Sequence, residues 1–352
     1  MGFALGQTAA SQSWTASTQS SAPNINPTRT TESHTKSGSS TLDTKSVQVL
    51  NPDGVYGPYY DVETETVQEN ATTSRSIART YGAGVNGTKE LSQVTEEEAQ
   101  NSENGDANRL RTTSNPNSNG NLQVVRREVT EAKMKDPESR DTQTTVYLID
   151  VGGELAPSMK IDEQQKRGVN GELELVKTTS LRDANGGWQV YEVGERTIKE
   201  NGQNRNTVER LSRRDYDGNV SPVSQVISHD TQINGQAATT TETYSIDVPG
   251  SPRDGKLHLI EHGATVEKSA PGRTTTEQQI EQPDPGDPQA GLGISTKKIN
   301  VIISNAQGTV ETHTISTRNP DEAHFTVVSV ETKKTDQIPA IQVQIAPSFK
   351  RK

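Results

Sequence analysis

Glycines recur along this chain at a nearly constant interval, and that interval limits the folds that the chain can adopt. Seven of them follow a turn-forming residue, with successive spacings of 33, 33, 33, 33, 32 and 37 residues. These are Gly54, Gly87, Gly120, Gly153, Gly186, Gly218 and Gly255, and Gly291 is a weaker eighth member. Apolar residues or proline usually occupy the second and fourth positions after the glycine. Side chains two positions apart on a strand share one face, so each glycine predicts the start of a strand.

A second recurring pattern precedes the glycines, namely a Thr-rich stretch that ends in an acidic turn. An example is TTVYLIDVG immediately before Gly153, and a further turn such as Asn201-Gly202 lies between successive patterns. Each unit is therefore predicted to run strand, turn, strand, turn. We expect an all-β fold of antiparallel β-hairpin repeats of about 33 residues, arranged as an extended sheet or sandwich, with a β-solenoid as the alternative. Asn-Gly and Asp-Gly turns favour hairpins because they reverse the chain.

The segment RRDYDGNVSPV, residues 213–223, shows the local chemistry of one unit. Asp217-Gly218 predicts a tight primed hairpin turn, because glycine tolerates positive φ. Pro222 follows in the new strand, at the place that Pro157 occupies in another unit. Proline cannot donate to a strand ladder, so we expect this position to lie at an edge, at a bulge or toward solvent.

The run DYDGNV at 215–220 resembles the Tyr-Asp core of bacterial YD (RHS-type) repeat proteins. That resemblance implies a secreted bacterial protein built from β-hairpins. The Tyr-Asp pair occurs in one unit alone, and the interval here is longer than the repeat of that family. The resemblance assigns no functional residue to this chain.

Composition narrows the class of protein. Hydrophobic residues make up 28% of the chain, against about 45–50% in typical soluble domains, which predicts a folded chain with a thin core. The chain has no cysteine and a net charge of −10, which argues against a nucleic-acid partner. Apolar runs are a few residues long, so we expect no membrane span. The Ser/Thr/Asn-rich composition predicts an extracellular or cell-surface location.

The chain is expected to have three parts. Residues 1–50 form a Ser/Thr-rich N-terminal arm or linker, residues 51–290 the hairpin repeats, and residues 291–352 C-terminal capping or interaction strands. Unpaired sheet edges invite another strand. Candidate strands for pairing with another subunit lie near both ends and contain Val47, Val49, Ile341, Val343 and Ile345. A disordered N-terminal tail and a C-terminal cap that closes the array are the alternatives.

Two motifs resemble catalytic or cofactor sites and are interpreted otherwise. His258, Glu261 and His262 match the H-x-x-E-H zinc pattern, which requires a helix. On a strand the two histidines would share a face about 13 Å apart, too far to hold one ion. Gly82, Gly84 and Gly87 fit G-x-G-x-x-G without a strand–helix context and are interpreted as a turn. We expect no metal, no cofactor and no catalytic residue.

The leading functional prediction is a structural subunit of a secreted bacterial filament, sheath or surface fibre. Such a subunit would assemble as a homo-oligomer or homopolymer through β-edges or terminal strands. The alternative is an adhesin or glycan-binding repeat module that meets cell-surface glycans through Trp188, Tyr191, Tyr216 and Tyr244. The sequence does not predict an enzyme.

Overall fold

The structure is a computed structural model of the whole chain. It describes residues 12–22, 25–84, 87–168, 171–233, 236–246, 255–284, 291–305, 308–318 and 324–337, with side chains from residue 27 onward except at 233, 336 and 337. The described residues contain strands and turns and no helix, so none of them forms a helix that could cross a membrane.

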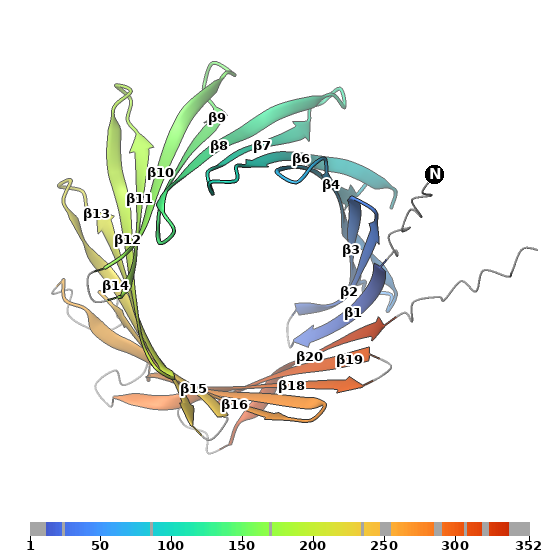
Figure 1. Cartoon of the computed structure of the whole chain (residues 1–352). Coiled ribbons are helices and arrows are strands. Elements are labelled where there is room, and N and C mark those ends of the chain that lie inside the picture. Colours follow the sequence, from blue (N-terminus) through green and yellow to red (C-terminus); the bar gives the residue numbers. More distant parts are fainter. Residues whose placement is uncertain are drawn as a thin grey trace, which may run out of the picture.

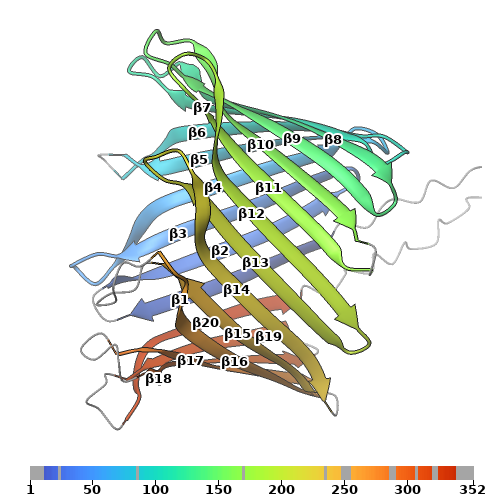
Figure 2. The same ribbon diagram turned by 90° about the vertical axis from the view of Figure 1, so that its left-hand side faces the viewer.

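In the part of the chain that the structure describes, twenty antiparallel strands follow one another around a closed barrel (Figure 1). Each strand pairs with the next in sequence, and β1 pairs with β20 to complete the ring. Figure 2 shows the strands tilted across the barrel wall. The strands are β1 (Gln12–Ala22), β2 (Ile25–Ser37), β3 (Ser40–Leu50), β4 (Tyr56–Gln68), β5 (Thr73–Ala83), β6 (Lys89–Asn101), β7 (Ala107–Pro116), β8 (Leu122–Asp136), β9 (Ser139–Ile149), β10 (Leu155–Arg167), β11 (Leu173–Arg182), β12 (Trp188–Asn201), β13 (Asn204–Arg214), β14 (Val220–Ile233), β15 (Gln236–Ser245), β16 (His258–Ala270), β17 (Arg273–Pro283), β18 (Leu292–Asn305), β19 (Gly308–Thr317) and β20 (Thr326–Gln337).

The predicted all-β fold of antiparallel hairpins is confirmed, and its arrangement is corrected. The sheet is neither open nor paired in a sandwich, and its strands are antiparallel neighbours, unlike the parallel coils of a solenoid. Closure gives each strand two partners and removes the free edges that an open sheet would leave.

The seven repeat glycines lie in turns at one end of the barrel, which we call the glycine-turn end. All seven have positive φ, between 69° and 89°. In the turn before β14, the Asp215 N–H donates to the Asn219 carbonyl at 2.9 Å, with three residues between them. The predicted two-residue primed turn at Asp217-Gly218 is therefore wrong. A three-residue loop with a left-handed glycine forms instead.

An Asp or Asn side chain stabilises several of these turns. In the turn before β12, Asp183 Oδ1 accepts hydrogen bonds from the backbone N–H groups of Gly187 at 2.8 Å and Asn185 at 2.9 Å. These donors, together with the Gln189 amide, hold the pKa of the Asp183 carboxyl below its ordinary value. Such Asx interactions explain why an acidic residue precedes the glycine in the sequence.

A β-bulge follows each repeat glycine at the fifth position. After Gly120, Thr113 pairs with Arg126 but Ser114 pairs with Val124, so Val125 is an extra residue. The same register shift recurs in every even-numbered strand from β4 to β20. Pro222 pairs with Ser212 beside one of these bulges, as expected for a residue without a backbone donor. Bulges bend a sheet, and a ring of nine equivalent bulges favours closure.

The two faces of the sheet differ in burial. Residues paired in register share a face, so one face can be followed from strand to strand around the ring. Among the residues whose side chains are described, five of the six buried apolar ones lie on the same face. They are Val47, Ala132, Val146, Ile198 and Ile280. Side chains crowd together on the concave side of a curved sheet, so this face lines the barrel interior. We call it the inner wall.

The outer face has two zones. The residues two positions after the turn glycines, such as Leu122, Trp188 and Val220, lie on it at the glycine-turn end and are exposed. Further along the strands the outer face carries charges, for example Glu96 and Glu98 on β6. The alternation that marks strands in the sequence thus places apolar side chains outward near one end.

Both chain ends differ from the expected division into parts. The region expected to be an arm contains β1, β2 and β3 (residues 12–22, 25–37 and 40–50), and β18 to β20 continue the barrel wall. Val47 pairs with Thr30 and Tyr60, and Val49 with Thr28 and Gly57, so strands of the same chain flank both valines on either side. They are not available for another subunit in this structure. Ile341, Val343 and Ile345 lie outside the described residues.

Candidate functional site in the inner wall

The inner wall is polar and does not fill the barrel. Its middle rows carry hydroxyl side chains, including Thr142 and Thr144 on β9 and Thr239 and Thr241 on β15. Among the described residues, Val146 is the one large side chain that is almost completely buried, with 1% exposed. Barrels of about 16–18 strands already leave room for water inside. This 20-stranded barrel is wider still, and the main element pairs in contact are strands that are neighbours or next-but-one neighbours in the wall.

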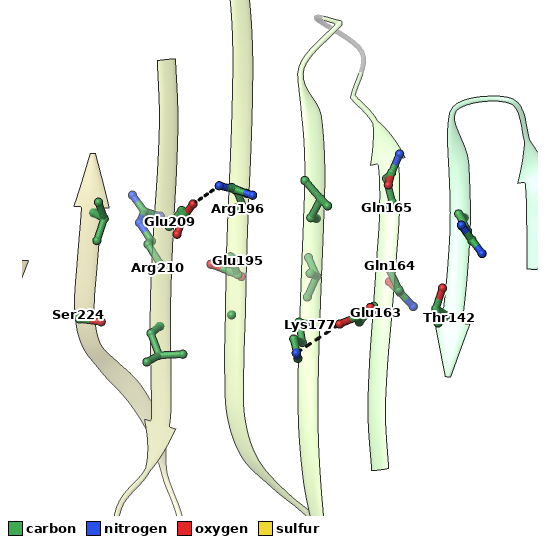
Figure 3. Close-up of a pocket in the computed structure, with 16 residues that line it drawn as sticks. Thr142, Glu163, Gln164, Gln165, Lys177, Glu195, Arg196, Glu209, Arg210 and Ser224 are labelled. Carbon is green, nitrogen blue, oxygen red and sulfur yellow. Dashed lines mark ion pairs between the residues drawn. The ribbon is translucent and has the colours of Figure 1, made fainter. Parts of the chain in front are cut away.

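A depression in the inner wall extends across β9 to β14 (Figure 3). Its volume is about 630 Å³, within the range of small-molecule sites. Gly194 lies near its centre on β12, opposite Lys177 and Leu211 in register. Because glycine has no side chain, the wall is thin at this point. The nearest atom that a Cβ at Gly194 would meet is the Lys177 carbonyl oxygen, 4.0 Å away.

Two ion pairs frame the depression, and both are drawn in Figure 3. Arg196 Nη2 lies 2.6 Å from Glu209 Oε1, joining β12 to β13. Lys177 Nζ lies 3.4 Å from Glu163 Oε1, joining β11 to β10. All four side chains are about half exposed, so each pair contributes at most about 1 kcal/mol to stability. Their main effect is to place charges of both signs at fixed positions on the wall.

Arg140 differs from the other cations of the depression. It lies on β9, in register with Met134 and Gln165, and makes no ion pair with a described residue. Its Nε is buried and has no hydrogen-bond acceptor among the described residues. Arg210, by contrast, shares the outer face with Gln225 and donates through Nε to Gln225 Oε1 at 3.0 Å. A buried donor without an acceptor carries a desolvation cost of about 1–3 kcal/mol.

Apolar side chains complete the depression. Leu175, Leu211 and Val226 lie on the inner face of β11, β13 and β14 and contribute to its lining. Ser224 and Thr142 add hydroxyl groups. The depression can therefore hold a solute that combines an apolar part with charged or hydrogen-bonding groups.

The sequence did not predict this site, although it contains two signals of it. An isolated glycine inside a strand pattern, as in YEVGERTIKE, marks a place where the wall lacks a side chain. Some of the charged residues are also four positions apart and so share a face, namely Glu192, Arg196 and Glu200 on β12 and Arg205, Glu209 and Arg213 on β13. Neither signal identifies which face is concave, because both faces are polar.

The residues singled out as motifs lie outside the lining of this depression. His258, Glu261 and His262 lie on β16, as expected for a strand. The prediction that the two histidines share a face is wrong. His258 pairs with Ser245 and His262 with Glu242, and the bulge between them reverses the alternation. The described residues contain no group of three His, Asp or Glu side chains that could hold a metal ion. Gly82 lies inside β5. In the turn after this strand, the Gly87 N–H donates a hydrogen bond to the Gly84 carbonyl.

The predictions of a filament or fibre subunit and of a homopolymer are wrong. They required a free sheet edge or a terminal strand, and β1 and β20 use each other instead. The adhesin alternative and its glycan partner required aromatic residues on an open sheet. Trp188 and Tyr191 are exposed, but they lie on β12 of a closed barrel, and the Tyr244 hydroxyl donates to Glu242 Oε2 at 2.7 Å.

The prediction that the chain has no membrane span is also overturned. It rested on the absence of long apolar runs, a criterion that applies to helices. A strand crosses a bilayer with about 9–11 residues, and the strands here contain 10 to 15 residues within a closed barrel. The length of apolar runs therefore cannot exclude a membrane role.

Comparisons with known proteins give a likeness of fold. No family model matches the chain, and no curated protein matches it. Similar solved structures include the siderophore receptor PirA from Pseudomonas aeruginosa, at 8% identity and a TM-score of 0.40, covering 95% of this chain and 81% of that one. The copper transporter OprC has 6% identity and a TM-score of 0.43, with the same coverages. The alcaligin outer membrane receptor FauA from Bordetella pertussis has 9% identity and a TM-score of 0.38, covering 95% and 77%.

Proposed function

We propose that this protein is a conduit at the cell surface, whose barrel encloses a water-filled passage for polar solutes. The solute passes or is held without a chemical reaction. The observation that carries the proposal is the inner wall, which is polar along β9 to β16 and leaves its side chains partly accessible to water. A barrel whose inner side chains packed against one another would bury them and leave no passage.

Charges on the inner wall suit a passage for polar molecules. Ion pairs on the wall, such as Arg213 with Glu192 at 2.8 Å, present both signs of charge to the lumen. Hydroxyl groups between them can exchange hydrogen bonds with water and solute alike. The proposed passage therefore has no apolar constriction along β9 to β16 that would exclude water.

The first test uses the absence of cysteine in the chain. Thr240 and Thr241 are neighbours on β15, and Thr241 pairs with Ser228 and Gly263 on the inner wall while Thr240 lies on the outer face. We expect Thr240→Cys and Thr241→Cys to react with N-ethylmaleimide at rates within about tenfold of each other. A maleimide carried on a long polymer should react readily with Thr240→Cys alone. Labelling is followed by intact mass.

A second measurement tests passage itself. In planar lipid bilayers, Thr241→Cys should give current steps that fall after addition of a bulky methanethiosulfonate, because the label narrows the lumen. Thr240→Cys is the matched control, with unchanged current. If N-ethylmaleimide reacted with neither cysteine, the proposal that the barrel is hollow would be contradicted. Current that is insensitive to the label at position 241 would contradict passage through it.

A further inference from the structure

Arg140 is the one cation that lines the depression without a partner among the described residues. Lys177 and Arg196 are neutralised by Glu163 and Glu209, and Arg210 donates to Gln225. The buried Nε of Arg140 lacks an acceptor. A guanidinium group presents donors in a planar fork that suits a carboxylate or phosphate. This position is thus ready to accept an anionic group.

The neighbours of Arg140 define the rest of a ligand. Gln165 lies beside it in register on β10, and Leu175 lies next to Gln165 on β11. Leu211 and Val226 extend the apolar lining toward β14. A molecule anchored at Arg140 would lay its remaining part over Gly194, where the wall lacks a side chain.

We infer that the depression binds an anionic solute, with Arg140 as the anchor of its carboxylate or phosphate and the leucine side chains as the contact for an apolar part. The inference names the solute class for the proposed conduit and rests on it for the route by which the solute arrives. The guanidinium group of Arg140 forms charge-assisted hydrogen bonds with an anion, which gives the anion an advantage over a neutral molecule of the same shape.

The test compares three probes of similar shape, namely hexanoate, hexyl phosphate and hexanamide. Methyl NMR of the full chain should show shifts at Leu175, Leu211 and Val226 with the two anions. Hexanamide should bind at least tenfold more weakly. The tighter of the two anions assigns the group as a carboxylate or a phosphate.

Variants locate the anchor. Arg140→Gln should raise the dissociation constant for the anions at least tenfold. The matched control is Arg126→Gln, which removes an inner-wall arginine already paired with Glu128 at 2.6 Å, and it should change the constant less than twofold. Gly194→Leu, which leaves every charge in place, should abolish the methyl shifts by filling the depression.

Three results would overturn the inference. They are equal affinity for hexanamide and hexanoate, an unchanged constant in Arg140→Gln, and an equal loss in Arg126→Gln, which would indicate diffuse positive charge. Because binding is measured by NMR and passage by cysteine labelling and current, the two proposals can fail separately. Binding without current would refute the conduit alone. Current without anion binding would refute the Arg140 site alone.

Discussion

Removal of residues 1–22 is expected to abolish the monomeric barrel and to cause aggregation. The deletion removes β1, which pairs with β2 on one side and β20 on the other. The remaining 19 strands cannot close again in the same way. β2 and β20 are both even-numbered and run in the same direction, so an antiparallel ladder between them is impossible. Two unpaired edges would be left, and such edges recruit other strands.

Size-exclusion chromatography and thioflavin fluorescence measure this outcome. The matched control is deletion of residues 1–11, which removes no residue paired in the β1 ladders and should leave a monomer. An ion pair also crosses the seam, because Lys333 on β20 reaches over β1 to Glu32 on β2 at 3.0 Å. That pair contributes about 1 kcal/mol at most, so it cannot replace β1. A stable monomer without residues 1–22 would refute the closed ring.

Val146→Asp is expected to destabilise the barrel by about 3 kcal/mol or more. Val146 is 1% exposed, on the inner face of β9, in register with Glu128 and Met159. A carboxylate there would lose its hydration, and the neighbouring Glu128 carboxylate would repel it. The midpoint of urea unfolding, followed by circular dichroism of the sheet, should fall markedly.

Leu148→Asp is the matched control for that change. Leu148 lies on the same strand and the same face two residues further on, but it is 39% exposed. Its replacement introduces the same charge beside Arg126, its register partner, and should shift stability by less than about 1 kcal/mol. If both variants unfold at the same urea concentration, the burial of Val146 does not contribute to stability as the structure implies.

The local elements could be predicted from the sequence because their causes are local. Gly153 adopts positive φ in a turn, and Asp150 caps that turn through its own side chain. Pro222 lies at a bulge because it lacks a donor. The interval of 33 residues corresponds to two strands and two turns of one hairpin. These features depend on residues within a few positions of one another.

The candidate site could not be predicted in the same way. Arg140, Lys177, Arg196 and Glu209 come from four strands and share a wall only after the sheet has curved. Hydrophobic alternation normally separates a buried face from an exposed one. Here both faces carry charge, so the pattern at Glu209 or Glu96 does not indicate which of them faces the lumen.

The sequence by itself determined the strands, their antiparallel order, the turn glycines and the absence of a thick core. The tertiary structure decided that the sheet closes, because closure depends on pairing between Ser20 and Glu331, more than 300 positions apart. No local pattern encodes that pairing. It follows from the accumulated bend of the bulges and from the even number of strands, which brings β20 antiparallel to β1. The same closure argues against an assembling fibre and supports the proposed passage.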